Sequence, residues 1–370
     1  MSIYDLEPDA LAALLADEPA WRIEQLRHGL YREGRPLEEI STLPRTLRAR
    51  LRAAVGPDLE LAAKQVADEG RTVKLALRAP DGALIETVLM RYDDRTSVCV
   101  SSQAGCAMGC RFCTTGQAGF IRHLRVGEIL EQVAWAQRVQ GTGRISHVVF
   151  MGMGEPLANA RAVVEAIGRL RSDVGISPRR ITVSTVGIVP GIHRLRTTRL
   201  PVTLAISLHA ANDALRSELV PMNRRYPIEA VLEAGANWSR ATGRRLTLEW
   251  ALIAGVNDRH RDAVELAARA RSLGAHVNLI PLNPTPGYPM VGTDEAGVRR
   301  FARQLRELGV NVTVRDTRGR DIDAACGQLA TSLVVAQGID EHEGLGRRGA
   351  RLVSPVGSLK LGEGPSAQVG

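Results

Sequence analysis

From about residue 92 onward, short apolar runs alternate with segments in which apolar residues recur every three or four positions. The short runs predict buried β-strands at residues 98–100, 147–151, 181–184, 202–209, 246–252, 277–280 and 312–314. The spaced apolar residues predict helices around residues 126–133, 263–273 and 298–308. Repeated strand–helix alternation favours a parallel α/β barrel or part of one. A doubly wound open sheet is the alternative, but no G-x-G-x-x-G motif opens a helix here.

The first 91 residues have a different pattern and predict a separate small α+β module. Apolar spacing indicates helices at residues 7–15, 21–31 and 45–52, and two alternating strands at 71–78 and 84–91 flank a Pro-Asp-Gly turn. The third helix has a basic side, so we interpret the module as an RNA-docking domain with phosphate contacts from Arg45, Arg48, Arg52 and Lys74. A solvated accessory fold is the alternative. Residues 92–338 then form the core, and the Gly-rich residues 339–370 predict a flexible tail.

Composition narrows the class of protein. The chain has 48 Lys and Arg against 40 Asp and Glu, a net charge of +8, which suits a polyanionic partner such as RNA or simply an Arg-rich solvated surface. No run of 18 apolar residues predicts a membrane span, and the acidic start MSIYDLEPDA lacks the apolar region of a signal peptide. We therefore expect a cytoplasmic protein with no membrane partner.

The cysteines are concentrated in one loop. Four of the five, Cys99, Cys106, Cys110 and Cys113, lie within fifteen positions, and the last three form C-x3-C-x2-C. Three thiolates at this spacing can hold a cubane iron–sulfur cluster and leave one iron without a protein ligand. A structural zinc site normally has four ligands, and no His lies between Cys99 and Cys113. A fourth cluster ligand at Cys99 or Cys326 would instead favour an iron–sulfur electron-transfer or binding protein without radical chemistry.

Polar residues gather where the predicted strands end. Gly152-Met-Gly-Glu-Pro follows one strand, Ser184 ends the next, Ser207 and His209 end a third, and Asn283 follows a fourth. Each has an ordinary structural explanation, such as a backbone hydrogen bond or a turn. Together they predict one cofactor pocket, because the carboxyl ends of parallel strands meet at one end of a barrel.

Six ordered motifs resemble one enzyme family: CVSSQAGCAMGCRFCTTGQAGF, MGMGEPLAN, ITVSTVGIVPG, ISLHAANDALRSELVPMN, NLIPLNPTPG and TRGRDIDAACGQL. The resemblance is to the radical S-adenosylmethionine RNA methyltransferases that modify carbon 2 of adenine. It implies a partial parallel (β/α)6-type barrel with a small N-terminal α+β domain, a [4Fe-4S] cluster and S-adenosylmethionine. Its implied partners are 23S ribosomal RNA, transfer RNA in several members, and a reductase or flavodoxin-type electron donor, with the protein a monomer. The related carbon-8 branch, which gives antibiotic resistance, is the alternative, but the Glu-Pro and HAAND stretches look more like the carbon-2 branch.

The resemblance also implies residue roles. Cys106, Cys110 and Cys113 match the cluster ligands, and the contacts to S-adenosylmethionine match Gly154, Glu155, Ser184, Ser207, Leu208, His209 and Asn283. Cys326 matches the cysteine that becomes S-methylated, and Cys99 matches the thiol that resolves the RNA adduct. Glu86 matches the proton acceptor, although its place in the predicted hairpin also fits a surface charge.

Overall fold

The computed structural model describes residues 1–283, 289–316, 319, 322–324 and 328–329. Cys326 and the predicted tail lie outside the described residues. Among the described residues, no helix is both long enough and apolar enough to cross a bilayer.

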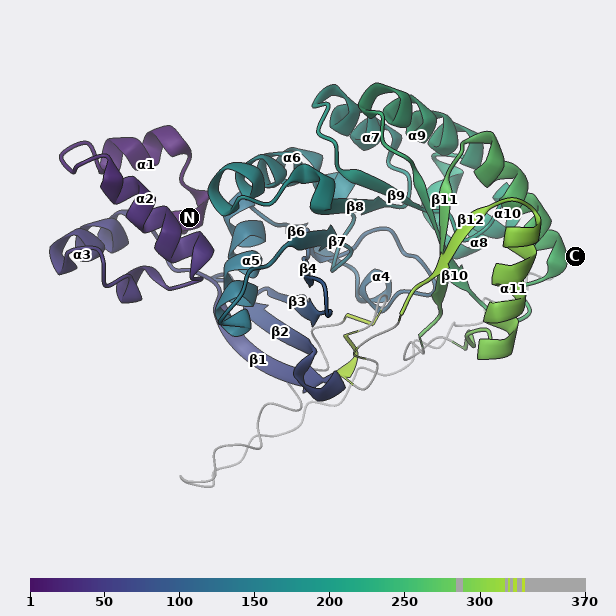
Figure 1. The fold of residues 1–370 in the computed structure, drawn as a ribbon, viewed down its shortest axis with the longest axis horizontal. Coiled ribbons are helices and arrows are strands. Elements are labelled where there is room, and N and C mark those ends of the chain that lie inside the picture. Colours follow the sequence, from purple (N-terminus) through teal and green to yellow (C-terminus); the bar gives the residue numbers. More distant parts are fainter. Residues whose placement is uncertain (284–288, 317–318, 320–321, 325–327, 330–370) are drawn as a thin grey trace, which may run out of the picture.

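A ten-stranded sheet runs through the described part of the chain, in the order β1-β2-β3-β4-β7-β8-β9-β10-β11-β12 (Figure 1). Its first part is an antiparallel meander: β1 (Glu60–Ala67), β2 (Thr72–Arg78), β3 (Leu84–Arg91) and β4 (Thr96–Cys99). From β4 onward each strand pairs in parallel with the next: β7 (His147–Phe150), β8 (Ile181–Thr185), β9 (Thr203–Ser207), β10 (Thr247–Leu252), β11 (His276–Pro281) and β12 (Asn311–Val314).

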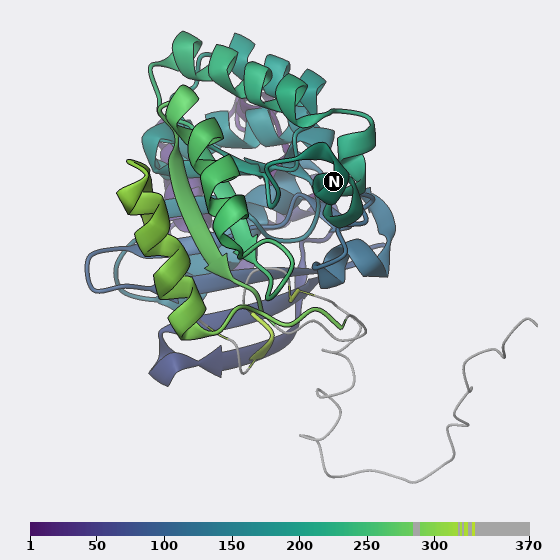
Figure 2. The same cartoon turned by 90° about the vertical axis from the view of Figure 1, so that its right-hand side faces the viewer.

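The parallel strands follow one another in sequence order, so the sheet curls into part of a barrel. A doubly wound sheet would need a reversal of strand order, and these strands have none. Helices cover the outer side of the curved sheet (Figures 1 and 2): α5 (Val126–Gln140), α6 (Ala160–Arg169), α7 (Val189–Thr197), α9 (Ile228–Thr242), α10 (His260–Ser272) and α11 (Glu295–Glu307). The expected partial α/β barrel is confirmed.

The buried face of α11 illustrates why these segments become helices. Val298, Phe301, Ala302 and Leu305 recur at helical spacing and are all buried, while Asp294 caps the helix by accepting a hydrogen bond from the amide of Gly297 at 2.7 Å. The spacing and the cap both come from the local sequence. This helix was accordingly predictable within a few residues.

The sheet continues across the domain boundary that was predicted near residue 91. Three helices, α1 (Pro8–Leu14), α2 (Trp21–Arg27) and α3 (Arg45–Ala54), form a group beside α5 (Figure 1). The predicted hairpin is present as β2 and β3, but β3 is hydrogen-bonded to β4, with Val88 opposite Cys99. The hairpin therefore continues the barrel sheet, and the expected boundary near residue 91 falls between two neighbouring strands.

The predicted phosphate contacts in this region need correction. Lys74 is only 4% exposed and lies 3.7 Å from the carboxylate of Glu86, so the prediction that it contacts RNA is wrong. Arg52 forms ion pairs with Glu38 and Asp58, and Arg48 donates a hydrogen bond to the Glu38 carbonyl. The basic side of α3 is thus largely committed to contacts within the protein.

Candidate active site

The cysteine loop is held at both ends by a two-stranded sheet that sequence reasoning missed. β5 (Gln103–Gly105) precedes the loop. β6 (Phe120–His123) follows the short helix α4 (Thr114–Ala118) and pairs antiparallel with β5. The amide of Cys106 donates to the carbonyl of Gly119 at 2.7 Å, which closes the loop. Gly105 has φ +72°, and a Cβ there would lie 2.1 Å from that same carbonyl oxygen. Glycine is therefore required where the loop begins.

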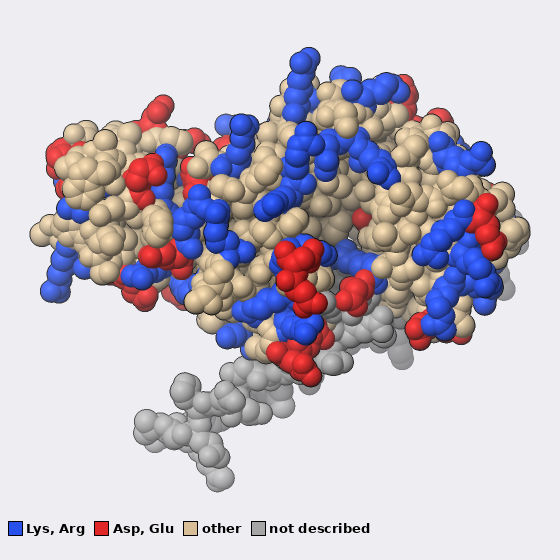
Figure 3. All heavy atoms as spheres, viewed as in Figure 1, with Lys and Arg blue, Asp and Glu red and all other residues tan. Residues whose placement is uncertain are grey.

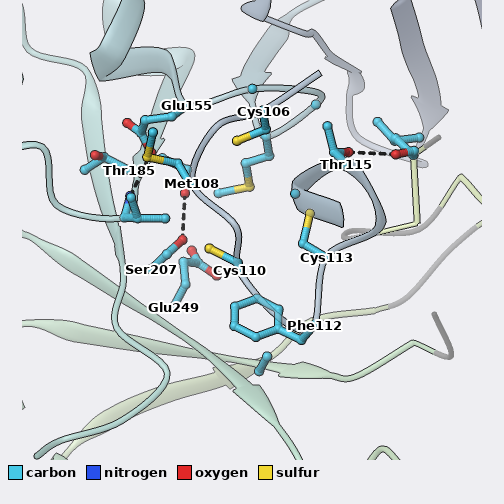
Figure 4. Close-up of a pocket in the computed structure, with 18 of the residues that line it drawn as sticks. Cys106, Met108, Cys110, Phe112, Cys113, Thr115, Glu155, Thr185, Ser207 and Glu249 are labelled. Carbon is cyan, nitrogen blue, oxygen red and sulfur yellow. Dashed lines mark hydrogen bonds between the residues drawn. The ribbon is translucent and has the colours of Figure 1, made fainter. Parts of the chain in front are cut away.

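The loop covers a cavity at the carboxyl ends of the parallel strands (Figure 4). The cavity encloses about 1000 Å³ between the atoms, its open mouth included. The predicted residues that line it are Cys106, Cys110, Cys113, Gly154, Glu155, Ser184, Ser207, His209 and Asn283. Leu208 does not line the cavity, although its carbonyl accepts a hydrogen bond from Arg216. The strand ends and the cysteine loop thus meet in one pocket, as expected.

The three thiols lie in poorly hydrated surroundings. Cys106 and Cys110 are buried and Cys113 is half-buried. Burial raises the pKa of Cys106 to about 12 and holds the pKa of Cys110 well above its usual value. These raised pKa values favour the protonated thiols. A bound cationic centre would favour the thiolates instead, because metal coordination deprotonates a thiol. All three thiols line the same cavity, and three cysteines at this spacing are a donor set that fits a cubane iron–sulfur cluster with one iron left open.

Glu155 presents a buried carboxylate to the cavity. Its two oxygens accept hydrogen bonds from the amides of Leu157 and Val186, both at 2.9 Å, and burial raises its pKa to about 7. The preceding Gly154 has φ +97°, and a Cβ there would lie 2.5 Å from the Cβ of Gln103. The GEP sequence therefore makes a sharp turn that aims the carboxylate inward. A carboxylate in this position can accept hydrogen bonds from an ammonium group.

Two serines and a buried arginine join the ends of β8 and β9. The hydroxyls of Ser184 and Ser207 are 3.3 Å apart. Arg216, fully buried on α8 (Asp213–Leu219), donates to the carbonyls of Val186 at 2.6 Å and Ser207 at 3.2 Å. Sequence reasoning missed Arg216, because its partners are backbone carbonyls from segments distant in sequence. Its guanidinium fixes the spacing of the two strand ends that carry the serines.

His209 is fixed in a single neutral form. It has the left-handed backbone conformation, with φ +58°, and its Nδ1 accepts a hydrogen bond from the amide of Ala251 at 2.9 Å. Burial, with a contribution from Arg216, lowers its pKa to about 3. Its ring packs edge-on against Phe112 of the cysteine loop, with centroids 4.5 Å apart. Because Nδ1 is an acceptor, Nε2 carries the proton and is the available donor.

Glu249 is a further site residue that the motifs did not identify. It lies in β10, lines the cavity and accepts a hydrogen bond from the side-chain amide of Asn278 at 2.8 Å. Burial raises the pKa of this carboxyl. The available signal was an acidic residue inside the apolar run LTLEWAL, where a buried strand rarely carries a charge.

Glu86 and Cys99 lie outside the lining of this cavity and close to the C-terminal segment. Cys99 is buried in an apolar cluster with Met153 and Leu329, and Ala324 packs against that cluster. Thr115 beside the cysteine loop donates a hydrogen bond to the Leu329 carbonyl at 2.7 Å. Cys326 itself is outside the described residues, but its described neighbours on either side contact the surroundings of Cys99.

The interpretation of Glu86 as a surface charge is wrong. Glu86 lies in β3 with no exposed surface, and the ammonium of Lys74 is 3.7 Å from its carboxylate. Lys74 also donates to the carbonyl of Asp323 at 3.4 Å. The buried Lys74–Glu86 pair therefore touches the segment that leads to Cys326.

Comparison with known proteins gives consistent matches. The family model described as "Radical SAM superfamily" matches residues 100–267. The chain is 51% identical over 333 residues to the probable dual-specificity RNA methyltransferase RlmN of Frankia alni, covering 86% of this chain and 80% of that protein. It is 49% identical over 347 residues to the protein of the same name from Thermobifida fusca, covering 89% and 94%. The crystal structure of a radical SAM methyltransferase from Sphaerobacter thermophilus matches with a TM-score of 0.84 and 46% identity, over 89% of this chain and 98% of that one.

Proposed function

Because this chain belongs to the radical S-adenosylmethionine RNA methyltransferase family of these relatives, we propose that it methylates carbon 2 of an adenine in 23S ribosomal RNA, and an adenine of transfer RNA as well. The observation that carries the proposal is the pocket in which the three thiols of C-x3-C-x2-C face the polar ends of four parallel strands. The relatives' name, with its dual specificity, supports two kinds of RNA substrate.

In this proposal the pocket binds both cofactors. Cys106, Cys110 and Cys113 hold a [4Fe-4S] cluster, which together with S-adenosylmethionine supplies one-electron chemistry and the methyl group. Glu155 accepts hydrogen bonds from the amino group of S-adenosylmethionine, and Gly154 lets the chain turn beside it. The hydroxyls of Ser184 and Ser207, the Nε2–H of His209 and the amide of Asn283 offer hydrogen bonds to its remaining polar groups. The buried, partly apolar walls exclude the water that would quench reactive species.

Carbon 2 of adenine has no lone pair and is electron-poor, so it cannot attack a methyl sulfonium directly. A chain thiol that first accepts the methyl group removes this obstacle, provided that the one-electron chemistry of the cofactors would then take one hydrogen atom from that methyl group, and we assign the thiol role to Cys326. Once the methylene carbon has bonded to carbon 2 and the adduct has given up one electron, Glu86 takes up the proton from carbon 2. The Cys99 thiolate then attacks the sulfur of Cys326 and forms a disulfide; the sulfur–carbon bond breaks, its electron pair stays on the methylene carbon, and that carbon takes up a proton as the methylated base leaves.

The contacts around Cys99 support this assignment. Cys99 packs with Leu329 and near Ala324, which flank Cys326 in sequence, and Glu86 lies in the adjacent strand. Turnover would also require an electron source, for which a reductase or a flavodoxin-type protein is the proposed partner of a monomeric enzyme in the cytoplasm.

The test is a nucleoside analysis. Anaerobically reconstituted protein is incubated with S-adenosylmethionine, dithionite and transcripts of ribosomal or transfer RNA, and the digested RNA is compared with authentic 2-methyladenosine and 8-methyladenosine by mass spectrometry. We expect 2-methyladenosine together with 5′-deoxyadenosine. 8-Methyladenosine would place the protein in the carbon-8 branch. A reconstituted cluster that yields neither methylated product nor 5′-deoxyadenosine would contradict radical methylation.

A further inference from the structure

A second hollow opens at the amino ends of the same parallel strands. It encloses about 1330 Å³ between the atoms, with its open mouth, and its walls include residues at or near the strand starts, among them His147, Thr203, Thr247 and His276. Met151 and Glu249 line both this hollow and the cysteine pocket. The two spaces are therefore two ends of one barrel interior, separated by a thin layer of side chains.

The rim of this hollow is basic. Arg179 and Arg180 line it just before β8, and Arg244 and Arg245 line an adjoining hollow that shares Thr203, Thr247 and His276 with it. We call these four arginines the basic rim. Among the residues that the structure describes, none of the four forms an ion pair with an acidic side chain. Figure 3 shows Lys and Arg side chains above and beside the hollow in the middle of this face, with Asp and Glu side chains along its lower edge.

The pKa values of two histidines near the rim are lowered, first by burial and then by nearby arginines. Burial lowers the pKa of His147, and Arg180 and Arg95 lower it further. Burial also lowers the pKa of His276, with a contribution from Arg245. Acidic groups are present as well, with Asp316 on the lining, Glu249 deep inside and Asp94 paired to Arg95. The unpaired arginines nevertheless leave the rim itself positively charged.

The interior walls are polar where they face this hollow. Hydroxyl and amide side chains project from successive strands: Ser97, Thr182, Thr203, Thr247, Asn278 and Thr313. Such walls offer donors and acceptors at many positions, which suits the edges of a heterocyclic base better than an aliphatic group. The space also adjoins the pocket where the proposed chemistry takes place, because the side chains of Met151 and Glu249 line both.

We propose that the basic rim binds RNA phosphates and that the target nucleotide enters the barrel through its amino-terminal end. This inference rests on the proposed function, because it needs an RNA base as substrate. An enzyme that modifies a ring carbon must take the base out of its stack, and the flanking phosphates then remain outside the cavity. Arg179, Arg180 and Arg245 are exposed and are suited to neutralise those phosphates, whereas Arg244 is half-buried and donates hydrogen bonds to the Val202 carbonyl and the Thr203 hydroxyl.

An acidic electron-donor protein is the other polyanion that a basic rim would attract. RNA is favoured because the rim surrounds an opening that leads inward, whereas an electron donor must approach the three cysteines at the opposite end of the strands. RNA therefore accounts for both the charge and the polar interior behind it.

The first experiment measures RNA binding to reconstituted protein by fluorescence anisotropy across a range of salt concentrations. The probe is a labelled RNA hairpin with the target adenine in its loop. Arg179→Gln/Arg180→Gln should reduce the slope of log K against log salt by about 1.4–1.8, since each phosphate contact contributes about 0.7–0.9. The matched control is Arg299→Gln/Arg303→Gln, which removes two exposed, ion-paired arginines from α11 and should leave the slope unchanged. Equal slopes for the two variants would overturn the proposal.

The second experiment uses the unaltered protein and so does not depend on the folding of a variant. Phenylglyoxal modification, mapped by peptide mass spectrometry, should be suppressed by the RNA hairpin at the four rim arginines but not at Arg299 and Arg303. Absence of protection at the rim overturns the inference even if 2-methyladenosine is formed. Protection without 2-methyladenosine would instead contradict the proposed function alone. Normal RNA binding by Arg179→Gln/Arg180→Gln, with slowed reduction by a flavodoxin, would assign the rim to the electron donor and overturn the inference.

Discussion

The two ends of the barrel are built from the same strands but differ in chemistry. At the carboxyl ends, buried thiols, Glu155 and a neutral His209 surround a sheltered pocket. At the amino ends, exposed arginines and hydroxyl side chains surround an open, polar hollow. A cofactor that must be protected from water and a polyanion that must arrive through water need these opposite surroundings. The comparison indicates that the two ends of the barrel bind different partners, the cofactor at the carboxyl ends of the strands and the polyanion at the amino ends.

The difference follows from the segments that join strands and helices. Segments after the strands, such as Gly152–Pro156, fold inward with a glycine at positive φ and bring polar groups over the pocket. Segments before the strands, such as Pro178–Arg180, are short and leave their arginines in solvent. Active sites at the carboxyl ends of barrel strands are the usual arrangement, and here the opposite end supplies the entrance.

Cys110→Ala should have the largest effect at one end of the barrel while leaving the function of the other end intact. Two remaining thiolates hold a cubane poorly, so we expect loss of the brown chromophore and of methylation to below detection. RNA affinity, which depends on the other end, should stay within about twofold of the unaltered protein. Iron analysis, visible spectra and anisotropy provide the measurements. Cys99→Ala is the matched control and should keep the chromophore. A Cys110→Ala protein that still binds about four irons with an unchanged spectrum would refute the ligand assignment.

The next largest effect concerns the junction between the two ends, where Met151 packs against the cluster that contains Cys99 and Leu329. Cys99→Ala should stop turnover after the RNA adduct has formed, because no thiol is left to attack the sulfur of Cys326. The trapped species is a covalent protein–RNA complex, detected as a nuclease-sensitive shift on a denaturing gel.

Two controls make this prediction specific to the paired thiols. Cys326→Ala should give no adduct, because the methyl carrier is missing, and Cys99→Ala/Cys326→Ala should give none either. Normal turnover by Cys99→Ala, or an adduct that persists without Cys326, would show that the thiol roles are assigned incorrectly.

A smaller effect is expected at Glu155. Glu155→Gln removes the charge that would face the amino group of S-adenosylmethionine, and a hydrogen bond to a charged group contributes about 1.5–3 kcal/mol. The affinity for S-adenosylmethionine, measured by equilibrium dialysis, should therefore fall by about 10- to 140-fold, while RNA affinity is unchanged. Ser184→Ala, a neutral hydrogen-bond deletion in the same pocket, should have a smaller effect. Equal losses in the two variants would argue against an ammonium–carboxylate contact.

Most of the barrel could be predicted because the parallel strands carry buried apolar residues at alternate positions, such as Val277 and Leu279 of β11. The six parallel strands from β7 to β12 lie where the sequence placed them, and the polar residues at their ends do meet in one pocket. β1 was missed because Glu60–Ala67 is largely exposed and rich in residues that do not favour strands. Its conformation depends on pairing with β2, which no local pattern reveals.

Lys74 and Glu86 show where local reasoning fails at the site. Alternating polar residues in the hairpin suggested one solvated face, but nearly every residue of β2 and β3 is buried. The two charges compensate each other across adjacent strands, in a register that only the folded sheet establishes. Arg216 was missed for the same reason, since its partners are carbonyls of other segments. In each case, a polar residue in a buried element marked a contact whose partner could not be identified from sequence.

The smallest predicted effect tests the positive potential of the amino-terminal end directly. Burial and then Arg180 and Arg95 lower the pKa of His147 from its ordinary value of 6.5, because a nearby positive charge disfavours the imidazolium form. Arg180→Gln should raise this pKa, whereas Arg299→Gln on α11 should not change it; titration of 13C-labelled histidines by NMR follows both. Bound RNA should also raise the pKa of His147, by neutralising the arginines.

The lowered pKa of His147 also affects stability. The folded protein should lose stability as the pH falls below 6.5, because the unfolded chain takes up the proton first, and His147→Gln should remove that contribution. An unchanged His147 pKa in Arg180→Gln would mean that burial alone sets it, and the electrostatic contrast between the two ends would then be weaker than the structure indicates.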